Sequence, residues 1–251
     1  ISKFYSKYQV MLEKEDLDLI FLIVNRFFAE NLAEKILEHK KNFILFSEKP
    51  FALSLQKANK LVKLAQKKNK TFFVGYMKRC DNGIRLLKNK INKLNLGRIS
   101  FVDYNSFDGD SFDKKDKYIK YKFKKISKKK NTSELKFLNT QCHSINLLEY
   151  LFGKLSLDHS YVNLAGEGIT IFKNNKNIKF VLKNRFNKKT EWYEKIKIFF
   201  EKGFIEVDIS APFFRNKATL ISYRKYSNRN STRINLFKKK WCFENQVKNV
   251  I

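Results

Sequence analysis

Strand-like apolar runs alternate with amphipathic helical segments over the first third of the sequence, and this alternation limits the folds open to the chain. The run at 16–24 is almost continuously apolar, which is typical of a strand buried on both faces of a parallel sheet. Between the runs, apolar residues recur every three or four positions opposite charged ones, which predicts helices. The expected order is strand 16–24, helix 29–41, strand 43–46, helix 55–65 and strand 71–76. This order is typical of a right-handed parallel α/β layer, and Ser54 is a suitable N-cap for its second helix.

The pattern changes in the remainder of the chain. A helix is expected at about 84–94, with Gly97 suited to a left-handed C-cap, and a second helix at 143–153, closed by its final glycine. The other segments alternate apolar and polar residues and are divided by turns that contain Asn, Lys and Gly, which predicts hairpins. The predicted fold class is α/β, with a partial Rossmann-type parallel sheet in residues 1–77 and an α+β domain on an open antiparallel sheet, covered on one face, in residues 78–251.

The chain is strongly basic, with 53 Lys and Arg against 24 acids and a net charge of +29. Either a nucleic-acid or anionic-membrane partner explains this excess, or codon usage that enriches Lys, Asn, Ile and Phe together. The lysines are spread from Lys3 to Lys248, which favours the compositional explanation. The Lys-rich segment at 113–130 contains aromatic residues and could follow a single-stranded nucleic acid, but a solvated loop is the stronger expectation. We therefore expect no specific nucleic-acid partner, with only weak polyanion binding.

The sequence gives little support for a membrane partner, a disulfide framework or a metal site. No apolar run approaches the ~20 residues of a membrane helix, so no membrane partner is expected. The three cysteines, at 80, 142 and 242, form no Cys-x-x-Cys pair. Their odd number argues against a disulfide framework or zinc site and fits a reducing cytoplasm. His39 and His159 have no acids at ligand spacing, so no metal site is expected.

The tripeptide Glu48-Lys49-Pro50 stands where the second predicted strand ends. Ligands of open α/β sheets bind outside the carboxyl ends of the strands. Pro50 fixes its own φ and biases Lys49 toward an extended conformation, so the two charged side chains would leave the strand in defined directions. A lysine in a partly buried cleft can exchange protons. A surface Glu-Lys pair before a helix is an equally good interpretation from local physics alone.

Two longer stretches resemble a known family. The stretch "FSEKPFALSLQKANKLVKLAQKKNKTFFVGYMKR" at 46–79 is similar to the Glu-Lys-Pro, helix and Val-Gly-Tyr…Arg arrangement of the Gfo/Idh/MocA oxidoreductases. The stretch "LNTQCHSINLLEYLFG" at 138–153 resembles their Asp-x-x-x-His helix, with His143 in the histidine place and Asn139 in the aspartate place. "GRIS" at 97–100 and "IKIFFEKGFIEV" at 196–207 are similar to the usual sequences of the family at these places. The similarity runs over nearly the whole chain in the expected order.

The resemblance implies an NAD(P)-dependent oxidoreductase of the cytoplasm that moves a hydride between NAD or NADP and a hydroxyl-bearing carbon of a sugar, cyclitol or nucleotide-sugar. The active site of such enzymes lies between a Rossmann domain and an open-sheet domain, and the sheet implies a homo-oligomer. A histidine beginning a helix would meet the positive dipole end, which favours the neutral imidazole a base needs. The implied catalytic residues are Lys49 and His143, the substrate-binding residues Tyr76, Arg79 and Asn139, and the cofactor-binding residues Asn25, Glu48, Lys49 and Pro50.

The sequence also departs from the family pattern. No Gly-x-Gly-x-x-Gly occurs, although that loop lets backbone N–H groups approach a pyrophosphate. Because the loop belongs to the first strand–helix unit, we expect the chain to be truncated before Ile1, and at its C-terminus as well. Asn139 cannot transfer protons as an aspartate can, though it can orient a hydroxyl. An inactive relative that binds a sugar or a polyanion is therefore the alternative function, and a nucleic-acid-binding module is a third.

Overall fold

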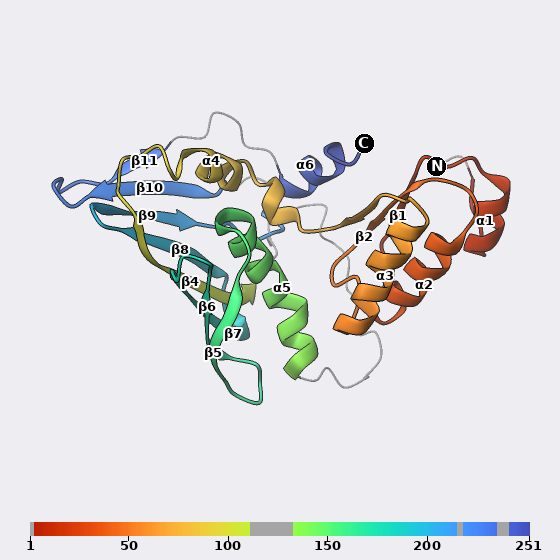
Figure 1. Cartoon of the computed structure of the whole chain (residues 1–251), viewed down its shortest axis with the longest axis horizontal. Coiled ribbons are helices and arrows are strands. Elements are labelled where there is room, and N and C mark those ends of the chain that lie inside the picture. Colours follow the sequence, from red (N-terminus) through yellow and green to blue (C-terminus); the bar gives the residue numbers. More distant parts are fainter. Residues whose placement is uncertain (1–2, 111–132, 215–217, 235–240) are drawn as a thin grey trace. The chain divides into compact units, whose positions relative to one another are not determined.

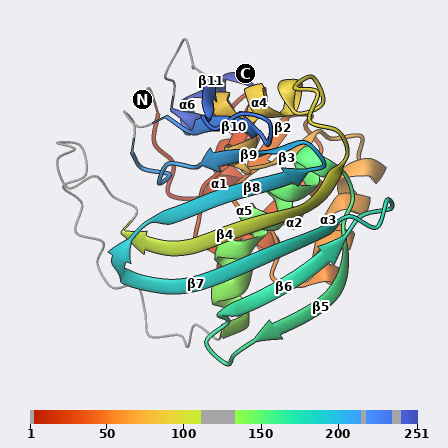
Figure 2. The same cartoon turned by 90° about the vertical axis from the view of Figure 1, so that its left-hand side faces the viewer.

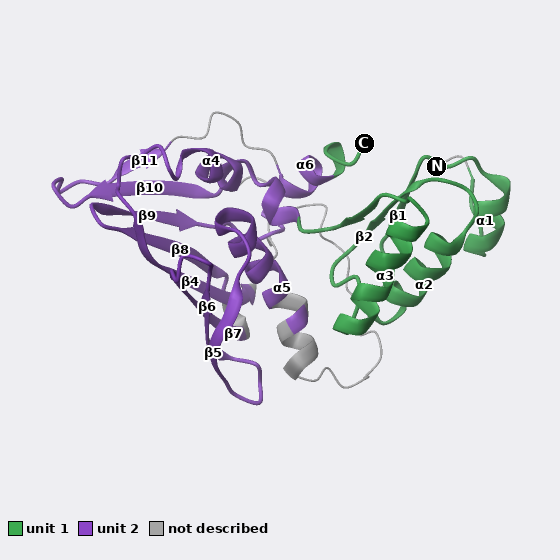
Figure 3. Cartoon of the chain, in the orientation of Figure 1, with its two compact units in different colours: residues 1–76, 247–251 green, residues 77–246 purple. Residues whose placement is uncertain are grey.

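The computed structural model of the chain describes residues 3–110, 133–214, 218–234 and 241–251, without the side chains of residues 110, 133–137, 139–140 and 187–190. The Lys-rich segment at 113–130 lies outside the described residues. The chain divides into two compact units, Ile1–Tyr76 with Val247–Ile251 and Met77–Gln246 (Figure 3). No helix in the described ranges is long and apolar enough to cross a membrane.

The first unit is built on a three-stranded parallel sheet of order β1-β2-β3, so the predicted parallel α/β layer is confirmed (Figure 1). Helices and strands alternate as the hydrophobic pattern indicates. The elements are α1 (Tyr8–Lys14), β1 (Leu19–Leu22), α2 (Arg26–Glu38), β2 (Ile44–Ser47), α3 (Leu55–Lys67) and β3 (Phe72–Val74). Ser54 caps α3 as predicted, because its side chain accepts a hydrogen bond from the backbone N–H of Lys57.

One face of this sheet carries the core of the first unit. Ile20, Leu22 and Leu45 pack with the buried residues of α2 and α3 in one apolar cluster. The opposite face carries a row of three phenylalanines, Phe21, Phe46 and Phe73, which the strand register places side by side. Phe21 is 36% and Phe73 39% exposed. The expectation that the first strand is buried on both faces is therefore wrong: its residues alternate between the core and an accessible face.

The second unit is built on an eight-stranded sheet of order β11-β10-β9-β8-β4-β7-β6-β5 (Figure 2). Its helices are α4 (Asn82–Lys90) and α5 (Ser133–Phe152), preceded by the 3-10 turn η1 (Met77–Cys80), and α6 (Cys242–Lys248) ends in the first unit. The strands are β4 (Ile99–Asp110), β5 (Ser156–Val162), β6 (Gly168–Lys173), β7 (Lys179–Glu191), β8 (Tyr193–Phe200), β9 (Gly203–Asp208), β10 (Leu220–Lys225) and β11 (Thr232–Ile234).

The core of the second unit lies between α4, α5 and one face of this sheet. Along β8, residues alternate strictly between buried and accessible positions, so Ile196, Ile198 and Phe200 point into the core. They pack with Leu147 and Leu148 of α5 in a single apolar cluster. The prediction of a sheet with one covered face is confirmed.

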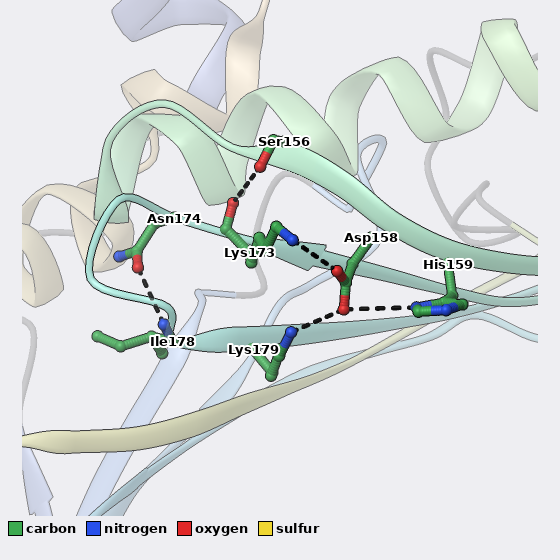
Figure 4. Close-up of polar contacts among 7 residues, drawn as sticks. All are labelled: Ser156, Asp158, His159, Lys173, Asn174, Ile178 and Lys179. Atoms are coloured by element: carbon green, nitrogen blue, oxygen red, sulfur yellow. Dashed lines mark hydrogen bonds and ion pairs between the residues drawn. The ribbon is translucent and has the colours of Figure 1, made fainter.

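The other face of the large sheet is lined by charged and aromatic side chains. Ion pairs cross neighbouring strands from Lys183 to Asp103 at 2.8 Å and from Lys197 to Glu206 at 3.1 Å. Near the β5 edge, the carboxylate of Asp158 accepts hydrogen bonds from Lys173 of β6 at 2.9 Å and Lys179 of β7 at 2.7 Å (Figure 4). These two ammonium groups lower the pKa of Asp158 well below its ordinary value. The pairs tie strands together on a face that no described helix of this unit covers.

Four sequence expectations need correction in this unit. The sheet is mixed rather than antiparallel, because β4 pairs with β7 in parallel. The helix expected at 84–94 begins and ends earlier, so Gly97, although left-handed with φ of 81°, does not cap it. The helix expected at 143–153 begins at Ser133, while Gly153 closes it as predicted. The short strand β11 was not predicted.

Candidate active site

The candidate residues of the first unit gather at one edge of its sheet. Because β1, β2 and β3 are parallel, their carboxyl ends meet at the same edge. Asn25 follows β1, Glu48-Lys49-Pro50 follows β2, and Tyr76 follows β3. A backbone hydrogen bond joins the ends of β1 and β2, since Glu48 N donates to Leu22 O at 3.2 Å. The fold thus brings together five of the eight residues that the sequence analysis selected.

The carboxylate of Glu48 packs against the end of β3. A Cβ placed on Gly75 would lie 2.9 Å from Glu48 Oε1 and 3.0 Å from Phe46 Cζ, which is closer than side chains tolerate. A side chain at position 75 would therefore push the carboxylate of Glu48 aside. The second oxygen of Glu48 accepts a hydrogen bond from the backbone N–H of Lys49 at 3.3 Å, and the Lys49–Pro50 peptide bond is cis. The Glu-Lys-Pro and Gly-Tyr motifs of the sequence are thus in direct contact.

Asn25 has a structural role at this edge. Its side-chain oxygen accepts a hydrogen bond from the backbone N–H of Phe27 at 3.1 Å and so caps α2. The N-terminus of α2 therefore opens at the same edge as Glu48 and Lys49. Both charged side chains are half-buried.

The second unit holds the remaining candidates, and His143 is the central one. His143 is 9% exposed and lies in the middle of α5, which begins at Ser133. The expectation that it begins a helix and meets the positive dipole end is therefore wrong, because the dipole effect fades within the first turn. Asn139 lies four residues earlier in the same helix, and its side chain is outside the described set.

Arg79 contacts the helix that carries His143. Its Nε donates a hydrogen bond to Asn146 Oδ1 at 2.6 Å, and its guanidinium carbon lies 5.5 Å from the ring centre of Tyr150. Positions 143, 146 and 150 follow one another on one side of a helix at three- and four-residue spacing. Arg79 thus contacts the side of α5 on which His143 also lies, although the two are 64 positions apart in the sequence.

A buried polar group beside these residues was missed by the sequence analysis. Glu194 of β8 is 3% exposed, and its Oε1 accepts hydrogen bonds from Lys78 of η1 and from the hydroxyl of Tyr104 in β4. Ser144 of α5 lies 2.9 Å from Ser106 of β4 between their hydroxyl oxygens. A signal was available, because the alternation of β8 assigns Glu194 to the same inward face as Ile196.

Burial shifts the proton affinities of several groups around this polar group. Burial and the neighbouring carboxylate of Glu194 raise the pKa of Tyr104 well above its ordinary value, so the phenol stays protonated. Burial also raises the pKa of Asp81, which caps α4 through the backbone N–H groups of Gly83 and Ile84. Burial raises the pKa of Cys242 to about 12, which keeps this residue a thiol. The three cysteines are free.

In the part of the chain that the structure describes, no three His, Cys, Asp or Glu side chains lie close enough together to bind a metal ion. His159 lies in the edge strand β5 and is 3.4 Å from Asp158, whose carboxylate is held by two lysines.

A comparison with known proteins finds a family match for the first unit. The family model described as "Oxidoreductase family, NAD-binding Rossmann fold" (Gfo/Idh/MocA) matches residues 1–76. Residues 1–76 are therefore similar to the Gfo/Idh/MocA oxidoreductases. A stretch of 92 residues is 35% identical to the inositol 2-dehydrogenase/D-chiro-inositol 3-dehydrogenase of Lacticaseibacillus casei. That match spans 36% of this chain and 26% of the enzyme. The resemblance inferred from the Glu-Lys-Pro and Val-Gly-Tyr motifs is confirmed.

Solved structures of similar oxidoreductases share the fold over nearly all of the chain. A 3-ketoreductase from Actinomadura kijaniata, crystallised with NADP and TDP-benzene, is similar with a TM-score of 0.76 at 11% identity, over 98% of this chain and 72% of that one. The UDP-N-acetylglucosamine 3-dehydrogenase of Acidithiobacillus ferrooxidans gives a TM-score of 0.67 at 15% identity, over 99% of this chain and 72% of that one. The α/β fold class, with a Rossmann-type parallel sheet followed by a larger sheet domain, is confirmed.

Proposed function

We propose that the protein is an NAD(P)-dependent oxidoreductase acting on a hydroxyl group of a sugar, cyclitol or nucleotide-sugar. The observation that carries this proposal is the carboxyl edge of the parallel sheet in the Gfo/Idh/MocA unit, where Asn25, Glu48, Lys49 and Tyr76 gather. The substrate classes in this proposal are taken from the similar inositol dehydrogenase and ketoreductase described above. Neither substrate is assigned to this chain in particular.

The edge of the first unit fits part of a dinucleotide site. Its parallel strand ends, the open N-terminus of α2 and the close packing of Glu48 on Gly75 suit a ligand that lies across the edge. The chain has no Gly-x-Gly-x-x-Gly loop, so its contribution to pyrophosphate binding is not of that type. Asn25, Glu48, Lys49 and Pro50 are the residues that would hold the nicotinamide cofactor, which supplies or accepts the hydride when bound.

Lys49 and His143 are assigned the proton chemistry. His143 would take the hydroxyl proton as the substrate is oxidised and return it in the reverse direction. Lys49 would polarise the same hydroxyl or relay its proton. An ammonium group held on a defined backbone is suited to this role. Tyr76, Arg79 and Asn139 would orient the substrate by hydrogen bonds, for which their side chains provide both donors and acceptors.

The test is a turnover assay with NAD and NADP against a panel of myo-inositol, glucose and UDP-N-acetylglucosamine. Lys49→Ala and His143→Ala are each expected to reduce kcat by about 10²- to 10⁴-fold, the usual contribution of general acid–base groups. Lys57→Ala is the matched control, because Lys57 pairs with Glu34 on the surface of α3 and has no proposed role. Undiminished turnover in the Lys49 variant would contradict the assignment.

The alternative is a catalytically inactive relative that binds a sugar or a polyanion. The amide at Asn139, where the family pattern has an aspartate, and the net charge of +29 favour it. It predicts saturable sugar binding without turnover, or binding to any polyanion that weakens steeply with salt. Measurable turnover that depends on Lys49 would exclude this alternative.

The large sheet suggests a homo-oligomer. On its open face Phe101 and Phe199 stack with ring centres 4.3 Å apart, and Phe101 is 40% exposed. An accessible aromatic pair flanked by paired charges suits contact with a second copy of the same face. Light scattering after chromatography of Phe101→Lys is the test, and an oligomer that persists unchanged would argue for a different interface.

A further inference from the structure

Glu194 of β8 is linked to η1 and to β4 by hydrogen bonds buried in the second unit. Its Oε1 accepts from Lys78 Nζ and from the Tyr104 hydroxyl, and the side chains of Lys78 and Glu194 are 9% and 0% exposed. Tyr104 belongs to β4, and β4 contacts α5 two residues further along, where Ser106 meets Ser144. Buried polar contacts therefore join η1 and β8 to β4, and β4 to α5.

Both ends of this series of contacts stand next to a residue of the proposed site. Lys78 directly precedes Arg79, and Ser144 directly follows His143. Arg79 is itself hydrogen bonded to Asn146 of α5, so η1 and α5 are held together at two places. The contact of Ser144 with β4 is a hydrogen bond, because its hydroxyl lies 2.9 Å from that of Ser106, which pairs with Glu194 in the strand register.

We propose that Glu194 is a positioning residue that sets His143 and Arg79 in their working geometry, through Lys78 of η1 and through Tyr104 of β4, the strand whose Ser106 contacts Ser144 of α5. This inference rests on the proposed function, which assigns His143 and Arg79 to the site. Glu194 acts on the reaction only through its hydrogen-bonded partners.

Physical chemistry favours this role over a contribution to stability. A buried ion pair gains little net stability, because the desolvation of both charges offsets their attraction, and its best-attested role is to fix one arrangement among several. Apolar side chains in the same place could pack in several arrangements, whereas the carboxylate must meet an ammonium and a phenol at defined distances. A residue held to one position by such a pair is suited to geometry-sensitive chemistry, where a misplacement of about 1 Å can cost ~100-fold in rate.

Two variants break these contacts in different ways. Glu194→Gln keeps the shape and one acceptor but leaves the buried Lys78 without its counter-charge. Tyr104→Phe keeps the buried ring and the charge pair but removes the hydroxyl that donates to Glu194. Glu206→Gln is the matched control, since Glu206 lies on the open face of the same sheet and pairs with Lys197. All three are made in the full chain.

Steady-state kinetics on the best substrate of the panel is the first measurement. Glu194→Gln and Tyr104→Phe are expected to lower kcat by up to ~100-fold, with the cofactor KM unchanged and the Glu206→Gln control at the wild-type rate. The double variant Lys78→Met with Glu194→Gln removes the unbalanced charge. A positioning role predicts that it recovers the unfolding midpoint but not kcat. Recovery of both together would show a merely structural role and overturn the inference.

The second measurement does not need turnover. The imidazole resonances of His143 are followed by NMR in the wild type and the three variants; the sequence has only three histidines, so substitution of the other two assigns them. The His143 resonances should shift in Glu194→Gln and Tyr104→Phe and stay in place in Glu206→Gln. Unchanged resonances in folded Glu194→Gln and Tyr104→Phe would refute the positioning role. A wild type that turns over no substrate while its variants shift His143 would refute the proposed function alone.

Discussion

Replacement of Lys70 by methionine is expected to weaken the first unit by about 2 kcal/mol. Lys70 is 9% exposed and follows α3, yet its Nζ lies 2.6 Å from the carbonyl oxygen of His39 and 3.5 Å from that of Ile36. These carbonyls close the C-terminus of α2, where a cation is favourable. The ammonium also lies 4.2 Å from the ring centre of Phe43.

The magnitude follows from these contacts. A hydrogen bond from a charged donor contributes roughly 1.5–3 kcal/mol, and a cation at a helix C-terminus roughly 0.3–1 kcal/mol. Desolvation opposes both, since burial lowers the pKa of Lys70 from its ordinary value of 10.5. Methionine retains the apolar stem, so the loss is confined to the ammonium. The net value of about 2 kcal/mol corresponds to a ~30-fold change in the unfolding equilibrium.

Hydrogen exchange of the β2 amides measures this change within the first unit itself, independently of the second. Their protection should fall ~30-fold in Lys70→Met. Lys67→Met is the control, because Lys67 ends α3 and is exposed. Equal protection in the two variants would refute the reasoning, since it would mean that the contacts of Lys70 with α2 contribute nothing.

The same residue gives a pH-dependent expectation of definite sign. The folded pKa of Lys70 lies below the 10.5 of the unfolded chain, so between the two values the unfolded chain binds more protons. The contribution of Lys70 to stability therefore rises with pH in that window and levels off above about pH 10.5. The neutral amine can still donate to the two carbonyls but no longer carries the desolvation cost of the charge. The stability difference between wild type and Lys70→Met should therefore widen as the pH increases toward this value, and a difference that narrows would contradict the shift.

Three further predictions concern the second unit. Asp158→Asn should remove a stabilising contribution that is present above the ordinary carboxyl pKa and lost as the pH falls through the lowered one, so acid unfolding monitored by circular dichroism should differ between variant and wild type only above that lowered pKa. Gly203→Ala should disrupt the β9–β10 pairing, because its Cβ would lie 2.2 Å from the carbonyl oxygen of Arg224; an unchanged thermal midpoint would contradict this. Cys242, with its pKa raised to about 12 by burial, should react with a thiol reagent at neutral pH only when the protein unfolds, and rapid labelling of the native chain would show otherwise.

Much of the fold was predictable because its signals are local. The alternation of strand-like and helical segments predicted the parallel sheet of the first unit, and Ser54 marked the start of α3 by its capping chemistry. The parallel pairing of β4 with β7 was not predictable in the same way. Alternation identifies a strand and its buried face, but the neighbour of a strand is decided by long-range connections, here through α5, β5 and β6.

The candidate site was predictable to a lesser extent. The strand ends that carry Glu48 and Tyr76 follow from the parallel order, so their meeting at one edge could be inferred. The start of α5 was missed because Asn139, Thr140 and their neighbours have low helix propensity, and packing against the sheet overrides it. The alternation of β8 places the acid Glu194 on the inward face. Its partner Lys78 is 116 residues away in the sequence, however, and local patterns do not identify such pairs.

The position of His143 changes the physical basis of its proposed chemistry. At a helix N-terminus the dipole would disfavour the charged imidazole, but α5 begins ten residues before His143, beyond the reach of that effect. His143 is 9% exposed, and burial penalises a charged side chain wherever it lies along a helix. The surroundings of His143 therefore depend on how α5 packs against the sheet. In the proposal, Glu194 sets this packing through Tyr104 and β4, so the buried pair and the proposed proton chemistry rest on the same contacts.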